Sequence, residues 1–413
     1  MPRFNMLNVR RGAPGWLTAL AMLCAPLGSQ TKPREADLKL PIGGTPGRYD
    51  AITDVAGVEV GHTTLISGRG KLVVGQGPVR TGVTVVHPRG KDNNDPVFAA
   101  WFTLNGNGEM TGTTWVQESG YLAGPVAITN THSVGVVRDA IIAWEVSRKN
   151  MLQPWWLPVV AETYDGGLND INGFHVKSEH VITALDNAKG GAVQEGVVGG
   201  GTGMRCLGFK GGIGTASRTL TVAEGGYTVG VLVQCNFGAR RNLRIAGVPV
   251  GEEITDLTSC IANSEPLPAG VTTRRCDAPP GPRDREDVDQ GSIIVVVATD
   301  APLLPHQLKR LVTRVSLGIG RQGGFGDNGS GDIFIAFSTA NPNSWSSTST
   351  ASLSMLTNDR ISPLFAATAQ ATEAAITNAL LAAETTTGAN DLRVFAMPVD
   401  RMLAAMKKYG RMP

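Results

Sequence analysis

Residues 291–303 read GSIIVVVATDAPL, and this stretch decides the centre of the fold. Residues 293–299 are β-branched or small and carry no charge, which is the pattern of a strand buried on both faces. The preceding residues 262–290 contain five prolines and a tail of mixed charge. A segment of this length without secondary structure is usually functional or a linker. The chain is therefore expected to pass from a solvated linker into a core strand, with Gly291 and Ser292 at the junction.

Further strands and helices alternate on both sides of this stretch. Short runs rich in valine and isoleucine predict strands at 83–86, 126–130, 159–162, 227–235 and 333–337. Helices are predicted at 134–148, 301–316, 364–384 and 402–409. The helix over 301–316 is expected to follow Asp300 as its N-cap, with Pro302 in its first turn. Interleaved helices and strands indicate an α/β or a layered α+β fold.

The composition of the 413-residue chain excludes several classes of protein. Charged residues make up 17%, and 37 basic residues against 35 acidic ones leave a net charge of +2. That balance argues against a nucleic-acid partner, which a clustered basic face would indicate. No apolar run reaches the ~20 residues that a membrane-spanning helix needs, so no membrane partner is expected.

The first 29 residues have the layout of a secretory signal peptide. Three arginines and no acid precede a short apolar run at 16–28, and the small residues Gly28 and Ser29 end it. The alternatives are a core helix or a retained anchor, for which the run is short. The protein is therefore expected to be exported, to the periplasm or the medium, with the periplasm favoured.

Four cysteines lie beyond this segment, and their spacing matches no CxxC metal pattern. An oxidising compartment permits disulfides. Cys260 and Cys276 flank one irregular stretch and form the best candidate pair. Cys206 and Cys235 lie in apolar runs and are interpreted as small buried hydrophobic residues.

The familiar catalytic and metal-binding motifs are absent from the sequence. There is no GxSxG or HExxH, and neither glycine run, 199–203 nor 211–214, completes GxGxxG or a P-loop. The six histidines show no metal-ligand spacing on a helix, so no metal or cofactor is expected. A Ser-His-Asp triad is compatible with the sequence, but no spacing points to one.

The Gly291-Ser292 junction fits self-cleavage. A serine hydroxyl can attack the carbonyl before it to form an ester that water cleaves, and glycine permits the strained turn. Ser292 would then be a new N-terminus at the head of a core strand, where it could act as a hydrolase nucleophile. The alternative is a linker that simply enters a strand.

Several long stretches, in this order, resemble one known family. They are YDAITDVAGVEVGHTT (49–64), LNGNGEMTGTTWVQESG (104–120), ITNTHSVG (128–135), PVVAETYDGGLNDI (158–171), VGGGTGMRCLGFKGGIGTASR (198–218), VQCNFG (233–238), GSIIVVVATDAPL (291–303) and NGSGDIFIAFSTAN (328–341). The chain resembles the DmpA-type aminopeptidase and β-aminopeptidase family of self-processing serine hydrolases. Its exported form is most similar to the β-aminopeptidase branch.

This resemblance implies an α+β fold, a four-layer αββα sandwich like that of N-terminal nucleophile hydrolases but with different connectivity. It implies a cut at Gly291-Ser292, giving an α polypeptide of residues 30–291 and a β polypeptide of residues 292–413 within one domain over 30–413. Family members need no metal and form homotetramers of the αβ unit. They release N-terminal residues, in some cases β-amino acids, from small peptides, amino-acid amides or esters.

The resemblance also implies roles for four catalytic residues. Ser292 matches the nucleophile, and Ser330 and Asp332 in NGSGD match the hydroxyl and carboxylate that support it. Asn236 matches the side chain that donates to the oxyanion. Taken alone, the SGD tripeptide is a glycine-rich turn before a strand, and Asn236 is a strand-end residue.

Three further residues match the substrate pocket. Glu162 matches the carboxylate that binds the free ammonium of the substrate, and Trp155 and Tyr164 match aromatic pocket walls. Without the resemblance, Glu162 is a strand-end acid and the Trp155-Trp156 pair belongs to the core. Asn105, Asn107, Glu109 and the 199–203 glycines are expected in tight loops near the site, without an assigned role.

Three functions remain open at this point. The favoured one is a self-cleaving aminopeptidase that releases β-amino acids through an acyl-enzyme. The second is an L-aminopeptidase or D-amino-acid amidase-esterase that uses the same residues. The third is a protein that cuts itself only to mature and then serves as a binding or structural subunit, for which an amine pocket at Glu162 would have no purpose.

Overall fold

The computed structural model describes residues 32–149, 151–263, 265, 273–279, 291–345 and 350–412. The predicted signal peptide and most of the predicted linker lie outside these residues. The chain divides into two units, Met1–Lys32 and Pro33–Pro413. All helices and strands given below belong to the second unit.

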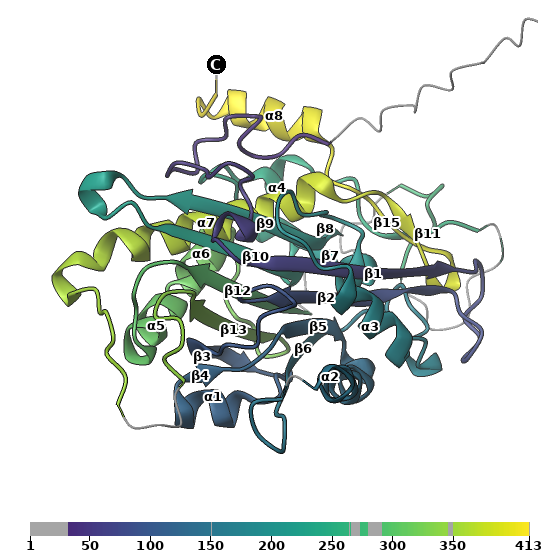
Figure 1. Ribbon diagram of the computed structural model, residues 1–413. Coiled ribbons are helices and arrows are strands. Elements are labelled where there is room, and N and C mark those ends of the chain that lie inside the picture. The colour runs from purple at the N-terminus through teal and green to yellow at the C-terminus, as the bar shows by residue number, and fades with distance from the viewer. Residues whose placement is uncertain are drawn as a thin grey trace, which may run out of the picture. The chain divides into compact units, whose positions relative to one another are not determined.

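Two large sheets form the centre of this second unit (Figure 1). The four-stranded sheet has the order β1 (Glu59–Ser67), β2 (Val79–His87), β5 (Val126–Asn130), β6 (Val159–Thr163). The six-stranded sheet has the order β4 (Tyr121–Leu122), β3 (Val97–Gly106), β13 (Gly331–Ser338), β12 (Ser292–Thr299), β10 (Thr228–Asn236), β9 (Gly212–Thr219). Within it, β12 runs parallel to β13 and antiparallel to β10.

The helices and two small sheets complete the unit. The helices are α1 (Thr113–Ser119), α2 (Val134–Arg148), α3 (Ser178–Asp186), α4 (Val250–Glu253), α5 (Pro305–Val312), α6 (Val315–Arg321), α7 (Ser362–Ala382) and α8 (Val399–Lys408). One small sheet has the order β11 (Cys260–Ile261), β15 (Leu392–Val394), β14 (Thr386–Thr387), and the other pairs β7 (Arg205–Cys206) with β8 (Phe209–Lys210).

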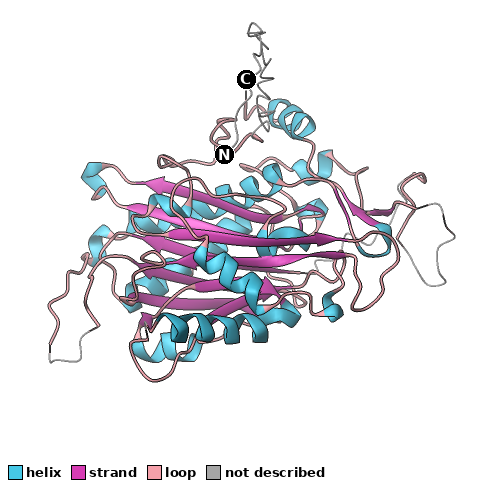
Figure 2. Ribbon diagram, turned by 45° about the vertical axis from the view of Figure 1, so that its right-hand side comes forward, coloured by secondary structure: helices cyan, strands magenta, loops and turns pink. Residues whose placement is uncertain are grey.

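Three clusters of buried apolar side chains separate four layers (Figure 2). The first cluster lies between the two large sheets, and the second packs α2 and α3 on the outer face of the four-stranded sheet. The third packs α5, α6 and α7 on the outer face of the six-stranded sheet. The predicted αββα sandwich is therefore confirmed.

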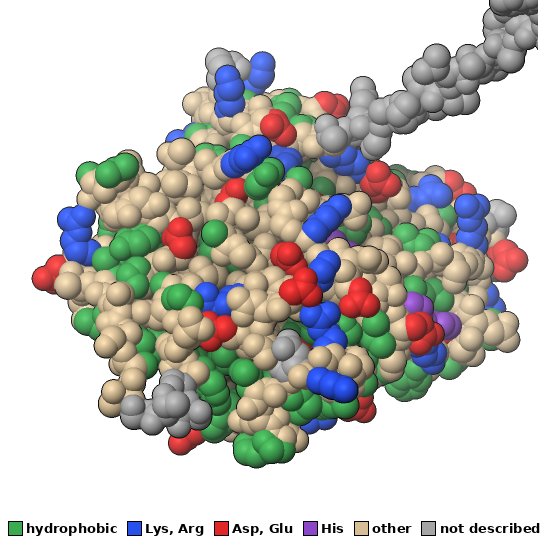
Figure 3. Space-filling model, viewed as in Figure 1, with side chains coloured by type: hydrophobic (Ala, Val, Ile, Leu, Met, Phe, Trp, Pro, Cys, Tyr) green, Lys and Arg blue, Asp and Glu red, His purple; other side chains and the backbone are tan. Residues whose placement is uncertain are grey.

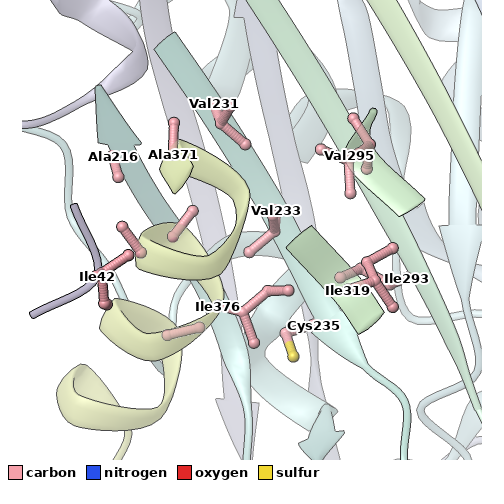
Figure 4. Close-up of a cluster of buried hydrophobic side chains, with 14 of the residues drawn as sticks. Ile42, Ala216, Val231, Val233, Cys235, Ile293, Val295, Ile319, Ala371 and Ile376 are labelled. Atoms are coloured by element: carbon pink, nitrogen blue, oxygen red, sulfur yellow. The ribbon is translucent and has the colours of Figure 1, made fainter. Parts of the chain in front are cut away.

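The burial of strand β12 on both faces explains the apolar run that begins at Ile293. Ile293 and Val295 point toward α6 and α7 in the third cluster, where they lie near Val233 and Ile376 (Figure 4). Ile294 and Val296 point to the opposite face and enter the cluster between the sheets. Because both faces of the strand are covered, every position can be apolar.

Most predicted elements are found close to their predicted bounds. Helix α2 and strand β5 match residue for residue, and α7 begins two residues before its prediction. The single helix predicted at 301–316 is wrong, because two helices, α5 and α6, lie there and the first begins at Pro305. Asp300 does not cap it. The carboxylate of Asp300 instead accepts a hydrogen bond from the Thr228 backbone N–H at 2.8 Å.

Two disulfides link the four described cysteines. Cys260 bonds to Cys276, as expected for the best candidate pair. Cys206 bonds to Cys235, so the interpretation of these two as unlinked apolar residues is wrong. Both lie in apolar surroundings, but β7 runs beside the end of β10 and brings the two sulfurs together.

The charged side chains on the surface are mixed in sign, as the balanced composition of the sequence predicts. On the face shown in Figure 3, acidic and basic side chains are interspersed and form no patch of one sign. Within the described residues, no helix is both long enough and apolar enough to cross a membrane.

Candidate active site

Ser292 is the first residue of β12 and lies at the centre of a cavity wall. Its register partners are Asn236 on β10 and Gly331 on β13, and its Oγ accepts a hydrogen bond from the Gly331 N–H at 3.1 Å. The cavity has a volume of about 570 Å³. It is lined by Asn107, Gly108, Glu109, Thr131, Glu162, Tyr164, Gly167, Gly203, Arg205, Asn236, Gly291, Ser292 and Gly329. Pairing on both sides therefore fixes the backbone of the serine at the cavity wall.

The residue before Ser292 has no room for a side chain. A Cβ at Gly291 would overlap the carbonyl oxygen of Asn236 and would touch Phe237. The peptide bond between Gly291 and Ser292 is thus pressed against the end of β10. Glycine is required here by this close approach of two backbones, in addition to the turn anticipated from the sequence.

Ser330 and Asp332 flank Gly331, the register partner of Ser292, and are almost completely buried. The Ser330 Oγ donates a hydrogen bond of 2.6 Å to Asp332 Oδ1. The same oxygen accepts a bond of 3.2 Å from the Ile293 N–H. Asp332 therefore joins Ser330 to the backbone residue that follows Ser292. With its proton committed to Asp332, the Ser330 hydroxyl can present a lone pair as acceptor.

Two asparagines bind the backbone of the segment 327–332, which contains Ser330 and Asp332. Asn105 accepts a 2.7 Å bond from the Asp332 N–H and donates a 2.9 Å bond to the Asp327 carbonyl. Asn107 donates a 2.9 Å bond to the Gly329 carbonyl. These residues had no role assigned from sequence. Their spacing of two at the end of a strand, in LNGNG, is the signal that could have identified them as a clasp.

Asn236 is oriented through both ends of its amide. Its Oδ1 accepts a 2.8 Å bond from the Arg205 N–H, and its Nδ2 donates a 3.0 Å bond to the Tyr164 carbonyl. An amide nitrogen has two hydrogens, so one remains for a group in the cavity beside Ser292. That is the arrangement of an oxyanion donor.

Glu162 places a buried carboxylate in the same cavity, with only 3% of its surface exposed. It accepts hydrogen bonds from the Glu109 N–H at 3.0 Å and from the Thr131 hydroxyl. No ion pair within the described residues involves it. Burial raises the pKa of Glu162, and the two hydrogen bonds oppose that rise. A cation bound beside it would compensate the desolvated charge.

The two aromatic residues of the predicted pocket have different surroundings. Tyr164 lines the cavity and is 56% exposed. Trp155 is 55% exposed and is not among the described lining residues, while its neighbour Trp156 is buried at 5% against α2 and α3. The structure thus brings together Ser292, Asn236, Glu162 and Tyr164, and it does not bring Trp155 to them.

Several lining residues were not singled out from sequence. Thr131 and Arg205 lie inside matched stretches, but a single threonine or arginine carries no signal of its own. No group of three or more His, Cys, Asp or Glu side chains in the described part of the chain could hold a metal ion.

Known proteins resemble this chain over nearly its whole length. The family model described as Peptidase family S58 matches residues 50–394. The β-peptidyl aminopeptidase BapA of Sphingosinicella microcystinivorans is 54% identical over 392 residues, which cover 95% of this chain and 96% of that protein. The protein of the same name from Sphingosinicella xenopeptidilytica is 46% identical over 400 residues, which cover 96% of both chains.

Solved structures share the fold. A β-aminopeptidase of Burkholderia sp. has a TM-score of 0.79 and 47% identity, covering 92% of this chain and all of that one. The L-aminopeptidase D-Ala-esterase/amidase of Ochrobactrum anthropi has a TM-score of 0.80 and 44% identity with the same coverage. The latter is described as a prototype for the serine aminopeptidases and a variant of the Ntn hydrolase fold.

Proposed function

The chain belongs to peptidase family S58 and is a serine aminopeptidase, and from this premise we propose that it is a β-aminopeptidase that matures by cutting itself at Gly291-Ser292. In this proposal Ser292 first cleaves its own chain and then releases N-terminal β-amino acids from short peptides and amides. The names of the two curated relatives support the preference for β-amino acids.

The position of Ser292 supports self-cleavage. Its Oγ attacks the Gly291 carbonyl carbon, the peptide C–N bond breaks, and the nitrogen becomes the free amine of Ser292. Water then hydrolyses the ester between the two residues, which leaves a carboxylate on Gly291 and restores the hydroxyl. The free amide hydrogen of Asn236 is placed to stabilise the negative oxygen that forms in both steps.

Catalysis on a substrate uses the same groups after Gly291 has been released. The substrate ammonium pairs with Glu162, and its acyl oxygen receives the hydrogen bond of Asn236. Ser292 attacks the acyl carbon, the leaving amine takes a proton and departs, and water hydrolyses the acyl-enzyme. The Ser292 amine accepts the proton of the nucleophile, or the Ser330 hydroxyl accepts it while passing its own proton to Asp332.

One observation carries this proposal: Glu162 is a buried carboxylate that forms no ion pair with any described residue, in the cavity that also holds Ser292 and Asn236. A protein that cut itself only to mature would need Ser292 and Asn236 but no such carboxylate. The observation therefore favours an aminopeptidase over a non-catalytic subunit.

The first test is intact-mass spectrometry with N-terminal sequencing of the purified protein beside Ser292→Ala. We expect a β polypeptide that starts at Ser292 in the wild type and an uncut variant. A single intact chain in both, still active on aminoacyl anilides, would overturn the assignment of Ser292.

A second candidate is an L-aminopeptidase or D-amino-acid amidase-esterase, which the name of the Ochrobactrum anthropi neighbour favours. Rates on β-alanyl and L-alanyl p-nitroanilide separate the two. A higher kcat/KM for the β-alanyl substrate is expected, and the reverse order would favour the second candidate.

We also propose export to the periplasm after removal of residues 1–29, and assembly into homotetramers of the αβ unit. The arginine-rich start with its apolar run and the two disulfides support export. Fractionation of cells with N-terminal sequencing tests the location, and light scattering of the purified protein tests the assembly.

A further inference from the structure

The described wall of the active-site cavity carries three charged side chains, and one of them is positive. Glu109 and Glu162 are carboxylates, and Arg205 is a partly exposed guanidinium. The backbone N–H of Arg205 is bonded to Asn236, but its side chain makes no hydrogen bond or ion pair with a described residue. A cation without a partner in an active-site wall is available to an anionic group of a ligand.

Asn236 is hydrogen-bonded to two segments of the cavity wall, one next to Glu162 and one at Arg205. The Tyr164 carbonyl accepts a hydrogen bond from the Asn236 Nδ2, and Tyr164 directly follows β6, the strand that carries Glu162. The backbone N–H of Arg205 donates to the Asn236 Oδ1, at the other end of the amide group. The segment that carries Glu162 and the backbone of Arg205 are therefore bonded to opposite ends of the oxyanion donor.

This arrangement gives a bound peptide a direction. If the substrate ammonium pairs with Glu162 and its acyl carbon lies between Ser292 and Asn236, the leaving group extends toward Arg205. In a dipeptide, the leaving amino acid ends in a carboxylate one residue beyond the scissile bond.

We propose that Arg205 binds the C-terminal carboxylate of the substrate, so that the preferred substrates are dipeptides with a free α-carboxylate. This inference rests on the proposed function, because it takes Glu162 as the ammonium site. A guanidinium offers two parallel N–H donors to a carboxylate, which fixes orientation as well as supplying attraction.

The backbone that carries Arg205 is well fixed. Its neighbour Cys206 is bonded to Cys235, which directly precedes Asn236. Lys210, the register partner of Arg205, donates to the carbonyls of Met204 and Gly211 at 2.7 and 2.8 Å. The guanidinium thus extends from a support that is tied to the catalytic amide.

The experiment compares three substrates that differ only after the acyl group: β-alanyl-L-alanine, β-alanyl-L-alanine amide and β-alanyl p-nitroanilide. In the wild type, kcat/KM for the free acid should exceed that for the amide by about tenfold to a hundredfold, the range of one charge-assisted contact. Arg205→Met should bring this ratio close to one by lowering kcat/KM for the free acid. Arg205→Lys should retain part of the preference for the free acid, because lysine keeps the positive charge but lacks the two parallel N–H donors of the guanidinium.

Arg138→Met is the matched control, since Arg138 lies on α2 with its side chain 39% exposed, and among the described residues its ion pair is with Asp139. It should preserve the ratio. The mass of the α and β polypeptides shows that each variant has folded and cut itself. If Arg205→Met does not mature, the wild-type ratio and the Arg205→Lys ratio still decide the question.

Other outcomes overturn the inference. Equal wild-type rates on acid and amide would do so, as would an Arg205→Met variant that loses all three substrates equally, because that loss would show a role in positioning alone. In both cases the proposed function stands. A fully cut wild-type protein that hydrolyses none of the three substrates would instead contradict the proposed function.

Discussion

At the scale of single residues, the active site depends on the absence of a side chain at Gly291. Gly291 lies so close to the Asn236 carbonyl that a methyl group would displace the scissile bond. A shift of about 1 Å at a reacting group can cost 10²-fold in rate. Gly291→Ala is therefore expected to slow self-cleavage about a hundredfold or more, seen by mass spectrometry as persistence of the 413-residue precursor or its exported form.

The matched control for this change is Gly320→Ala. Gly320 lies in α6, where an added Cβ would meet nothing within 4 Å. This variant should cut itself at the wild-type rate. Normal cutting of Gly291→Ala would show that the scissile bond does not lie against β10 when it reacts.

The negative charge of Glu162 is expected to be needed for substrate turnover but not for self-cleavage. Glu162→Gln keeps the shape of the side chain but cannot pair with a substrate ammonium. Breaking a buried, hydrogen-bonded charge pair costs about 2–5 kcal/mol, so kcat/KM on β-alanyl p-nitroanilide should fall about 30-fold to several thousandfold. Self-cleavage involves no ammonium at this place and should proceed. A variant that also fails to cut itself, although folded, would contradict this division of roles.

The same residue predicts a pH dependence. Burial raises the pKa of Glu162 above its ordinary value of 4.5. Only the ionised form can bind an ammonium, so kcat/KM should fall as the pH drops through this raised pKa and should be fully present above it. In Glu162→Gln this acidic limb should be missing from the residual activity. An unchanged limb in the variant would assign it to another group.

At the scale of elements, the disulfide between β7 and β10 braces the oxyanion donor. Cys206 and Cys235 are the immediate neighbours of Arg205 and Asn236, the two residues joined by the hydrogen bond that orients the amide. Replacing both cysteines by alanine should loosen that bond. We expect kcat to fall about tenfold, a part of the 10²–10³-fold that complete loss of an oxyanion donor costs.

The second disulfide provides the comparison. Cys260 and Cys276 lie on and near β11, outside the described cavity wall. Both double variants should melt at a lower temperature, because each disulfide closes a loop, of 29 and 16 residues respectively. Only the Cys206→Ala/Cys235→Ala protein should lose kcat. Equal effects on kcat would mean that the link acts through overall stability.

Most of the strands that are buried on both faces could be predicted from the sequence. Apolar runs revealed β2, β5, β6, β10, β12 and β13, because strands covered on both faces need no polar positions. Strand β9, GIGTASRT, was missed although almost all of it is buried. At Gly214 a Cβ would overlap the Ala375 carbonyl of α7, so close packing of a helix requires glycine there. In sequence such a strand looks like a loop.

The candidate site could be assembled only through the family resemblance. Ser292, Asn236 and Glu162 lie at or near the ends of three strands that are distant in sequence. Each residue taken alone has an ordinary structural explanation. What makes them a site is strand pairing, such as the register of Asn236 with Ser292, and no local pattern encodes that pairing.

At the scale of the whole molecule, the predicted cut divides a sheet that stays continuous. The order of the six-stranded sheet is β4-β3-β13-β12-β10-β9. A cut before Ser292 assigns β12 and β13 to the β polypeptide and the two strands on either side of them to the α polypeptide. The β polypeptide therefore supplies the middle of the sheet, and its β15 also pairs with β11 of the α polypeptide.

This interleaving predicts that the two polypeptides cannot separate without unfolding. Size-exclusion chromatography of the mature protein should show a single species that contains both, although a denaturing gel shows two bands. Neither polypeptide can bury its strand edges alone, so urea should release both in one cooperative transition. Trp345 is the one tryptophan after residue 291, whereas the α polypeptide carries Trp101, Trp115, Trp144, Trp155 and Trp156. Fluorescence of Trp345→Phe therefore reports the α polypeptide alone, and its difference from the wild type reports the β polypeptide. Two transitions at clearly different urea concentrations, or a β polypeptide that elutes alone under native conditions, would contradict the shared sheet. A single transition would mean that the cut frees the end of the nucleophile strand without creating a new domain boundary.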